Sequence, residues 1–378
     1  MTLGFAIIAA GAWAYLLLLR GGFWLTRERD DADSPPEPET WPSVVAVVPA
    51  RNEADVIGAS IGSLAEQNYP GDFRIVLVDD SSDDGTAAVA PASPRLEVLT
   101  NTSLPSGWTG KLWAVHHGVE HATRATKPDY LLLTDADISH SPDNLRSLVA
   151  RAESKDLVLT SLMAKLSTDS RADRLMIPAF VFFFAMLYPF AWVNDPRRKI
   201  AAAAGGCMLV RREALERAGG IAAIRHEIID DCALGRLLKL QGPIWIGLTE
   251  RARSLRPYGS LGAIGHMVAR SAYAQLGYSP VMLAGTVASM IVVYLAAPVL
   301  ALTTHGATMA LGLFAWVAML VAFQRTLRFY RLSPMWSAAI PLIALLYIAF
   351  TIRSAWDVWR GQGGQWKGRA QAAVGGAT

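Results

Sequence analysis

The stretch Tyr130-Leu-Leu-Leu-Thr-Asp-Ala-Asp-Ile138 decides the fold of this chain. An apolar run of the kind that forms a buried strand ends here in two carboxylates, Asp135 and Asp137. Open α/β sheets bind their ligands at the carboxyl ends of their strands, which is where these acids would emerge. Two carboxylates this close repel each other unless a cation lies between them, and oxygen ligands suit Mg²⁺ or Mn²⁺ holding a diphosphate. The alternative is a solvated turn that caps the next helix.

Strand-like and helix-like segments alternate on both sides of this stretch. Buried strands are predicted at residues 43–49, 73–78, 96–99, 130–133 and 157–162. Helices are predicted between them at residues 54–67, 86–90, 112–124 and 142–153. This alternation predicts an α/β fold with a parallel, doubly wound sheet.

Composition indicates a soluble domain attached to membrane segments. Of the 378 residues 52% are hydrophobic and 18% are charged, which is too apolar for an ordinary soluble domain. The net charge is +3 and no basic tract is interleaved with aromatics, so we expect no nucleic-acid partner. Two cysteines, Cys207 and Cys232, imply no disulfide framework.

Apolar runs at both ends predict the domain organisation. We expect an N-terminal membrane anchor in residues 1–24, a linker in 25–42, a ligand-binding domain in 43–278, membrane helices in 279–353 and a tail in 354–378. The C-terminal helices are predicted at 280–302, 307–323 and 334–352. Arginines after the second of them mark a cytosolic loop, whereas the basic tail leaves the direction of the last helix open.

Residues 174–193 form an apolar segment of nearly membrane-spanning length inside the predicted domain. Cations flank both of its ends, and Pro178 and Pro189 interrupt it. We expect it to lie on the cytosolic leaflet as an interfacial or re-entrant element. The alternative is a true membrane span, which would put the acids before and after it on opposite sides.

Two polar motifs follow the first two predicted strands. Val48-Pro-Ala-Arg-Asn-Glu53 places Arg51 and Glu53 at the sheet edge that carries the Asp pair. Val78-Asp-Asp-Ser-Ser-Asp-Asp-Gly-Thr86 adds Asp79 and Asp80, which can accept hydrogen bonds from a base and from ribose hydroxyls. The same loop could instead cap the helix that begins near Thr86, and both roles are compatible if Asp83 and Asp84 cap.

Gly110-Lys111 opens the next predicted helix, where a lysine could meet a phosphate with help from the helix N-terminus. A lysine in that position is also often simply solvated. Together with the Asp-Ala-Asp stretch, these motifs stand in one order after successive strands.

This series of motifs resembles the inverting family 2 glycosyltransferases with the GT-A (Rossmann-like) fold, over residues 43–278. The resemblance implies a nucleotide-diphosphate sugar donor, here a UDP-sugar, and binding of Mg²⁺ or Mn²⁺ by Asp135 and Asp137. It places the donor beside a set of residues comprising Arg51, Glu53, Asp79, Asp80, Lys111 and Asp135.

The second half of the domain continues the resemblance. Ala204-Gly-Gly-Cys-Met-Leu-Val-Arg-Arg-Glu213 resembles the family's acceptor loop, with Gly205 and Gly206 on the acceptor side. His226-Glu-Ile-Ile-Asp-Asp-Cys-Ala-Leu-Gly235 resembles the segment that carries the catalytic base, so the catalytic pair is Asp230 and Asp231, with Asp231 matching the base. Inversion requires a base on the face opposite the leaving diphosphate. The alternative is that Asp231 pairs with Arg236 or caps a helix.

The chain departs from the processive polysaccharide synthases of this family at their Gln-x-x-Arg-Trp motif. The corresponding stretch, Met267-Val-Ala-Arg-Ser271, keeps Arg270 and lacks the other two residues, which disfavours a processive polymerase. Arg270 could contact the donor diphosphate, with Arg253 and Arg256 beside it. The equal alternative is that these arginines contact lipid headgroups.

A closer resemblance, to the hopanoid-associated bacterial membrane glycosyltransferases, covers nearly the whole chain. It is carried by Asn194-Asp-Pro-Arg-Arg198, Ile228-Ile-Asp-Asp-Cys-Ala-Leu234 and Arg270-Ser-Ala-Tyr-Ala-Gln-Leu276. It implies a multi-pass enzyme of the bacterial inner membrane with a cytoplasmic catalytic domain. The acceptor would be a hopanoid or another polycyclic or polyprenyl lipid. Transfer to a polyprenyl phosphate, a catalytically silent membrane scaffold and a metal phosphohydrolase are the alternatives.

Overall fold

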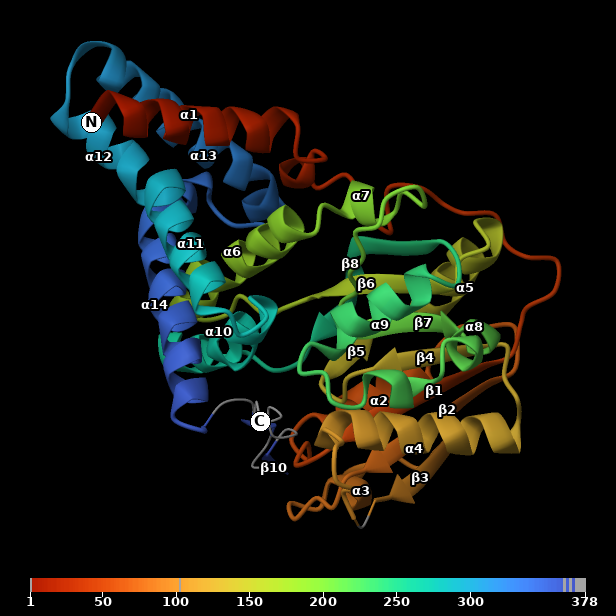
Figure 1. Cartoon of the computed structure of the whole chain (residues 1–378). Coiled ribbons are helices and arrows are strands. Elements are labelled where there is room, and N and C mark those ends of the chain that lie inside the picture. Colours follow the sequence, from red (N-terminus) through yellow and green to blue (C-terminus); the bar gives the residue numbers. More distant parts are fainter. Residues whose placement is uncertain (1, 102, 363–364, 367–368, 371–378) are drawn as a thin grey trace. The chain divides into compact units, whose positions relative to one another are not determined.

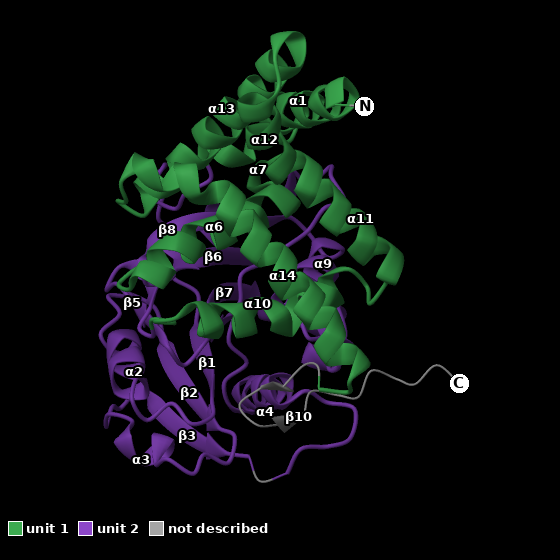
Figure 2. Cartoon of the chain, turned by 90° about the vertical axis from the view of Figure 1, so that its left-hand side faces the viewer, with its two compact units in different colours: residues 1–27, 168–191, 257–364 green, residues 28–167, 192–256, 365–378 purple. Residues whose placement is uncertain are grey.

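The computed structural model describes residues 2–101, 103–362, 365–366 and 369–370 (Figure 1). The predicted tail, residues 354–378, therefore lies partly outside the described residues. Two compact units make up the chain (Figure 2). The helical unit contains residues 1–27, 168–191 and 257–364, and the sheet unit contains residues 28–167, 192–256 and 365–378.

In the described part of the sheet unit, eight strands form one sheet in the order β3-β2-β1-β4-β7-β6-β8-β5. Their bounds are β1 Val44–Ala50, β2 Phe73–Asp79, β3 Leu96–Thr100, β4 Tyr130–Thr134, β5 Ile138–His140, β6 Leu159–Lys165, β7 Cys207–Arg211 and β8 Ile244–Ser254. Strand β1 pairs in parallel with both β2 and β4, and β2 pairs in parallel with β3. The carboxyl ends of these four strands therefore meet at one edge.

The prediction of a wholly parallel sheet is wrong, because the sheet is mixed. Strand β7 runs antiparallel to its neighbours β4 and β6, and β5 runs antiparallel to β8. The chain reaches β7 from the loop at residues 204–206, whose Gly206 carbonyl accepts a hydrogen bond from Thr134 at the carboxyl end of β4. A strand that starts at that edge must run back from it. Strands β5, β7 and β8 were not predicted, and β6 begins two residues later than expected.

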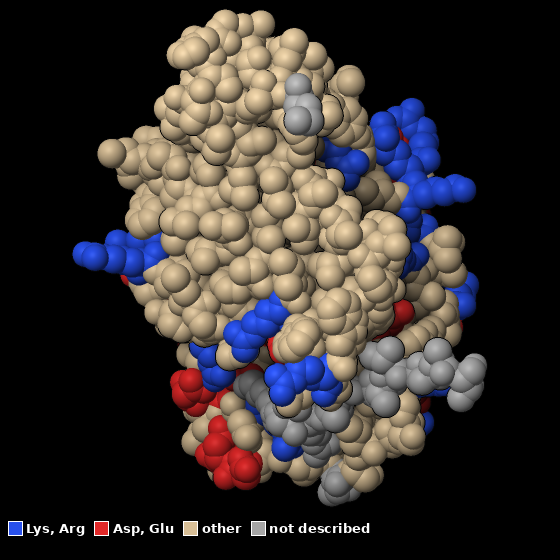
Figure 3. Space-filling model, turned by 60° about the vertical axis from the view of Figure 1, so that its left-hand side comes forward, with Lys and Arg blue, Asp and Glu red and all other residues tan. Residues whose placement is uncertain are grey.

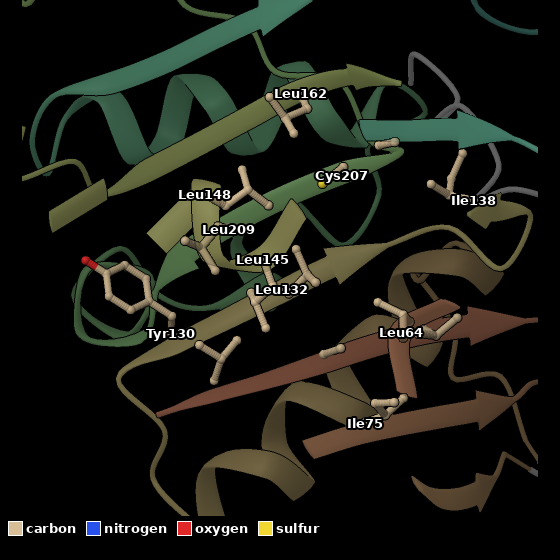
Figure 4. Close-up of a cluster of buried hydrophobic side chains, with 14 of the residues drawn as sticks. Leu64, Ile75, Tyr130, Leu132, Ile138, Leu145, Leu148, Leu162, Cys207 and Leu209 are labelled. Atoms are coloured by element: carbon tan, nitrogen blue, oxygen red, sulfur yellow. The ribbon is translucent and has the colours of Figure 1, made fainter. Parts of the chain in front are cut away.

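Helices cover both faces of the sheet. Those of the sheet unit are α2 Ile57–Ala65, α3 Thr86–Val89, α4 Gly110–Ala125, α5 Asn144–Ser154, α8 Arg212–Arg217, η2 Ile221–Ile224 and α9 Asp230–Lys239. The main core lies where Leu64 of α2 and Leu145 and Leu148 of α5 meet Ile75 and Leu132 of the sheet (Figure 4). Helix α4 packs on the opposite face, because successive strand residues point to opposite sides.

Gly118 is the point of closest approach between α4 and the sheet. A Cβ atom built at this glycine would lie 2.5 Å from Val47 Cγ1 and 2.9 Å from Val78 Cγ2. We therefore expect Gly118→Ala to lower the free energy of unfolding by about 1–3 kcal/mol, the usual cost of overpacking a core. Thermal unfolding of the detergent-solubilised chain measures this effect. Gly62→Ala on α2 is the matched control, because no atom lies within 4 Å of its Cβ position, and it should leave the midpoint unchanged or raise it.

Residues 28–42, most of the linker predicted at residues 25–42, form a strap that is bound along the sheet unit. The backbone of the strap pairs with Leu248, and Thr249 Oγ1 donates to the buried Asp30 carboxylate at 2.6 Å. Arg151, which is 2% exposed on its side chain, pairs with Asp33 at 2.5 Å. The segment still connects the two units in sequence, but its first part belongs to the fold of the sheet unit.

The helical unit contains α1 Thr2–Leu18, η1 Phe23–Leu25, α6 Arg171–Leu187, α10 Leu261–Gln275, α11 Pro280–Met290, η3 Ile291–Ala296, α12 Ala297–Thr303, α13 Gly306–Phe329, η4 Pro334–Ala339 and α14 Ile340–Trp359. A short helix, α7 Phe190–Val193, follows α6 where the chain returns to the sheet unit. The three predicted C-terminal helices are all present.

Four helical segments in the described residues are long and apolar enough to cross a membrane, namely Arg171–Val193, Pro280–Thr303, Gly306–Phe329 and Pro334–Trp359. Their outward side chains include Leu302, Val317 and Leu345, each about half or more exposed. Figure 3 shows a broad face of the molecule on which side chains without charge are continuous. An exposed apolar surface of this kind marks a membrane or protein contact.

Two predicted membrane elements differ from a regular membrane-spanning helix, because one is short and the other is interrupted. Helix α1 has 17 residues and spans about 26 Å, somewhat less than the roughly 30 Å of a hydrocarbon core, so it is a weak spanning segment. Residues 171–193 are interrupted at Tyr188, directly before Pro189, and half of their apolar window is buried. Their expected interfacial position stays a prediction.

Candidate active site

The expected sheet edge collects acids from three strands. Asp79 ends β2, Asp135 follows β4 directly, and Glu53 lies three residues after β1. Glu53, Asp79 and Asp80 are each less than 9% exposed. Asp79 Oδ1 is buried and has no hydrogen-bond partner among the described residues. A buried acceptor without a partner is costly unless a ligand supplies the donor.

The loops after β1 and β2 are joined into one structure. Arg51 Nη1 donates to the Asp80 and Ser81 carbonyls at 2.5 and 3.1 Å. The Glu53 amide donates to Thr86 Oγ1 at 2.8 Å. Arg51, predicted to bind the donor, therefore braces the loop that carries Asp80.

Asp84 ties the start of α3 to the loop after β1, although the N-cap residue of α3 is Gly85. Its Oδ1 accepts from the Thr86 amide at 3.0 Å, and its Oδ2 accepts from the Ala54 amide at 2.9 Å. Asp83 contributes its backbone amide, which donates to Asn52 Oδ1. Asn52 and Ser81 both have positive φ, 53° and 55°, which non-glycine residues adopt mainly at turns and functional sites.

Asp137 is held between β4 and β5, where its carbonyl accepts from the Leu255 amide at 2.7 Å. Burial raises the pKa of its carboxyl to about 6, and the negative charges of Asp135 and Glu53 add to the effect. The cations nearest this group are engaged by other acids. Arg256 pairs with Glu53 at 2.8 Å and with Asp55, while Lys111 pairs with Asp135 at 2.9 Å.

Arg256 contacts the loop after β1, a position that was not predicted from the sequence. It was grouped with Arg253 and Arg270 as a possible diphosphate ligand, yet it holds the loop after β1 through Glu53 and Asp55. Arg253 pairs with Glu250 at 3.3 Å. Arg270 belongs to the helical unit, where it lies on the exposed side of α10.

Asp230 and Asp231 begin helix α9 and face different partners. Asp230 Oδ2 lies 3.0 Å from Lys111 Nζ. Asp231 Oδ2 accepts from the Gly205 amide at 3.1 Å, and its Oδ1 accepts from the Cys232 amide at 2.7 Å. The second of these bonds stays within the first turn of α9, whose N-cap residue Ile229 has no side-chain cap bond. The first ties Asp231 to the predicted acceptor loop.

Burial raises the pKa of the Asp231 carboxyl to about 6, and the neighbouring Asp230 charge raises it further, while Lys111 acts in the opposite direction. A carboxylate with this pKa is ionised at neutral pH yet more basic than a solvated one, which suits a general base. Gly205 lies against it, since a Cβ at this position would be 3.6 Å from Asp231 Oδ2. Gly206 follows in the loop and packs against Ile138 and Ala164.

The acids of the site show whether a divalent cation could be held there. Within the described residues, no group of three or more His, Cys, Asp or Glu side chains is arranged to hold a metal ion. Asp135 and Asp137 offer two carboxylates in a region of excess negative charge. Mg²⁺ is commonly bound by one or two carboxylates together with substrate phosphates, so the pair fits a cation that arrives with a diphosphate.

The sheet unit has the GT-A glycosyltransferase fold. Residues 45–219 match the sequence model of Glycosyl transferase family 2. These residues, a little under half of the chain, therefore resemble a Glycosyl transferase family 2 domain.

A solved structure with the same fold is the mannosyltransferase PcManGT from Pyrobaculum calidifontis in complex with GDP-Man and Mn²⁺. It is 19% identical in sequence, the similarity covers 94% of this chain and 99% of that one, and the TM-score is 0.55.

Curated relatives share parts of the sequence. An N-acetylglucosaminyltransferase of Rhizobium sp. (strain N33) is 28% identical over 141 residues, which cover 36% of this chain and 29% of the relative. A beta-monoglucosyldiacylglycerol synthase of Synechocystis sp. is 33% identical over 114 residues, which cover 29% and 22%. The matched stretches thus span less than a third of either relative.

Proposed function

We propose that this protein is a membrane-bound, metal-dependent, inverting glycosyltransferase. It transfers a single sugar from a nucleotide-diphosphate sugar, a UDP-sugar, to a lipid acceptor. The observation that carries the proposal is that the acids fall into two groups, one at the ends of the strands and one on a helix. Glu53, Asp79 and Asp135 converge from three parallel strands, whereas Asp231 is oriented from a separate helix by the Gly205 amide.

The donor would lie along the loops after β1 and β2. Asp79 and Asp80 would accept hydrogen bonds from the nucleoside, and the buried, unpartnered Asp79 Oδ1 supports this assignment. Arg51 and Arg256 would keep the two loops in place through the contacts described above. Preformed acceptors of this kind lower the cost of ordering the site when the donor binds.

Asp135 and Asp137 would hold Mg²⁺ or Mn²⁺ against the diphosphate. When bound, such a cation would neutralise the charge that develops on the leaving diphosphate. The complex of PcManGT with GDP-Man and Mn²⁺ supports the use of a cation in this fold. The protein's own contribution is the acid pair, in which Asp137 is largely shielded from bulk water, so that electrostatic attraction there is stronger.

Asp231 would take the proton of the acceptor hydroxyl as that oxygen attacks the sugar. The two backbone amides fix its carboxylate, so its remaining lone pairs have a set direction. Gly205 and Gly206 would line the acceptor side, where a Cβ at residue 205 would be in van der Waals contact with both Asp231 and Lys111. Asp230 would remain paired with Lys111 and assist through its charge.

A lipid acceptor is supported by the apolar helices and by the names of relatives. The Synechocystis relative is a beta-monoglucosyldiacylglycerol synthase, and a Staphylococcus aureus relative is a 4,4'-diaponeurosporenoate glycosyltransferase. Four segments could embed the helical unit in a bacterial inner membrane, with the catalytic domain in the cytoplasm. Arg270 stays a proposed donor-binding residue, and the resemblance to hopanoid-associated enzymes makes a hopanoid the first acceptor to test.

The test is an assay of membranes that contain the full-length chain. A panel of nucleotide sugars is supplied with Mg²⁺ or Mn²⁺ and extracted hopanoids, and lipids are analysed by mass spectrometry. The proposal expects one lipid to gain the mass of one sugar. Release of free phosphate without sugar transfer would favour a phosphohydrolase, and failure to bind any nucleotide sugar would favour a silent scaffold.

The pH dependence of turnover should follow Asp231. The base must be ionised, so with a pKa of about 6 we expect kcat at saturating metal and donor to be constant above pH 7. It should fall about tenfold per pH unit below pH 6. Asp230→Asn removes the neighbouring negative charge and should move the midpoint to lower pH. A flat profile between pH 5 and 8 would remove Asp231 from the role of base.

A further inference from the structure

Lys111 is a buried cation that joins three elements of the sheet unit. Its Nζ lies 2.9 Å from Asp135 Oδ1 at the end of β4 and 3.0 Å from Asp230 Oδ2 at the start of α9. It is the second residue of α4, and its side chain is 20% exposed. One ammonium group therefore bridges an acid proposed to bind metal and an acid beside the proposed base.

The surroundings hold the ammonium in its charged form. Carboxylate oxygens of Asp135 and Asp230 lie 2.9 and 3.0 Å from it, and opposite charges at this distance favour the charged form. Beside the ammonium lies a cavity whose lining is largely apolar and includes Val115, Ile224 and Leu234. A cation placed against such a lining depends on its carboxylate partners, because little water can solvate it.

Space around the ammonium is limited. A Cβ atom at Gly205 would lie 3.5 Å from Lys111 Nζ, so the acceptor loop passes close to it. A divalent cation binds a carboxylate oxygen at about 2.1 Å. An ion on Asp135 and an ammonium 2.9 Å from the same carboxylate would thus be only a few ångströms apart and would repel each other.

We infer that Lys111 is an internal counter-cation, which occupies Asp135 when no divalent cation is bound and competes with a free divalent cation for that carboxylate. The inference rests on the proposed function in one respect, the binding of metal at Asp135. The flexible four-carbon stem allows the ammonium to leave Asp135 while it stays near Asp230. A cation that arrives with a diphosphate brings negative oxygens, which can pair with the ammonium in place of Asp135. Lys111 therefore weakens the binding of the free metal rather than that of the metal–diphosphate complex.

This arrangement makes Lys111 a positioning residue with a selective effect. Free Mn²⁺ must displace the Lys111 ammonium from Asp135 and gives the ammonium no new partner. A Mn²⁺–nucleotide complex supplies phosphate oxygens as a new partner. The chain should therefore bind Mn²⁺ weakly in the absence of nucleotide and more tightly in its presence. The pairing with Asp230 keeps the start of α9 in register with the end of β4 in both states.

The experiment measures binding of Mn²⁺ alone to the detergent-solubilised full-length chain by the loss of the free Mn²⁺ paramagnetic resonance signal. We expect Lys111→Met to bind Mn²⁺ about 5- to 150-fold more tightly than the unmodified chain, the usual range for coupling between two sites. Lys111→Arg keeps the cation and should bind Mn²⁺ as weakly as the unmodified chain. No sugar transfer is needed for this readout.

Lys165→Met is the matched control. Lys165 is also largely buried, with a side chain 14% exposed, and it pairs with Glu250 at 3.0 Å at the end of β6. Its loss should leave Mn²⁺ affinity unchanged. The thermal midpoint without metal should fall in Lys111→Met, which leaves two acids without their cation, and added Mn²⁺ should raise it more than in the unmodified chain.

The possible results distinguish a failure of the counter-cation role of Lys111 from a failure of the proposed function. Equal Mn²⁺ affinity in the unmodified chain and in a folded Lys111→Met variant overturns the inference and leaves the proposed glycosyltransferase intact. Absence of Mn²⁺ binding to every variant, with or without nucleotide, overturns the inference together with the metal dependence. A lower midpoint that Mn²⁺ does not restore shows a purely structural ion pair and also overturns it.

Discussion

Replacing Asp231 by asparagine is expected to lower the rate of sugar transfer by about 10²–10⁴-fold, the usual contribution of a general base. The amide has the shape of the carboxylate but cannot accept a proton at neutral pH. Donor binding should persist, because Asp79, Asp135 and Asp137 are unchanged. Turnover is measured by lipid mass spectrometry, and binding of UDP with Mn²⁺ is measured by calorimetry.

The structure adds a check on folding. Asp231 accepts one backbone hydrogen bond on each oxygen, and an asparagine can keep only one of them. The lost bond should cost about 1 kcal/mol, visible as a small fall in the thermal midpoint. Asp156→Asn is a suitable control, because Asp156 is 90% exposed and pairs with Arg211. Wild-type turnover in Asp231→Asn would contradict the base assignment and favour an acceptor that is already anionic, such as a polyprenyl phosphate.

Replacing Asp137 by asparagine is expected to have opposite effects on function and on stability. Loss of a first carboxylate from a two-carboxylate site should weaken Mn²⁺-dependent donor binding by about 10- to 100-fold or more. The unliganded chain should become more stable at neutral pH, since the substitution removes a buried charge that Asp135 and Glu53 repel. A pKa raised from 3.8 to about 6 corresponds to a gain of up to about 3 kcal/mol.

Calorimetry with UDP and Mn²⁺ and a thermal melt without ligand measure the two effects on the same sample. Asp72→Asn is the control, because its side chain is 62% exposed and pairs with Arg74 on the surface. A structural aspartate would give the reverse pattern, with a lower melting midpoint and unchanged donor binding. That pattern would exclude Asp137 from the metal site.

The sequence predicted the parts of the fold that depend on short, strongly patterned segments. Strands β1, β2, β3 and β4 were predicted because each is an apolar run closed by turn residues or acids. Their parallel pairing explains why the acids after them lie at one edge. Strand β8, Ile244–Ser254, was not predicted because its second half alternates charged and small residues, and only its pairing with β5 and β6 makes it a strand.

Side-chain partners in the site could not be predicted from motif order. Lys111 was expected near donor phosphates. Its position between Asp135 and Asp230 depends on where the start of α9 lies, more than a hundred residues away in sequence. Arg51 and Glu53 were both assigned to the donor. In the structure Arg51 also donates to backbone carbonyls and Glu53 pairs with Arg256. Such pairings depend on tertiary packing, which a single sequence does not specify.

The strap at residues 28–42 sets a practical limit on how the protein can be shortened. A fragment that began at Ser43, where the first strand is expected from sequence, would lack both Asp30 and Asp33. It would leave the Arg151 guanidinium, 2% exposed, without its carboxylate and would strip Arg251 of a partner at 3.0 Å. Deleting one member of a buried pair typically costs about 3–5 kcal/mol, so a fragment intended for solution studies should begin at or before Glu28.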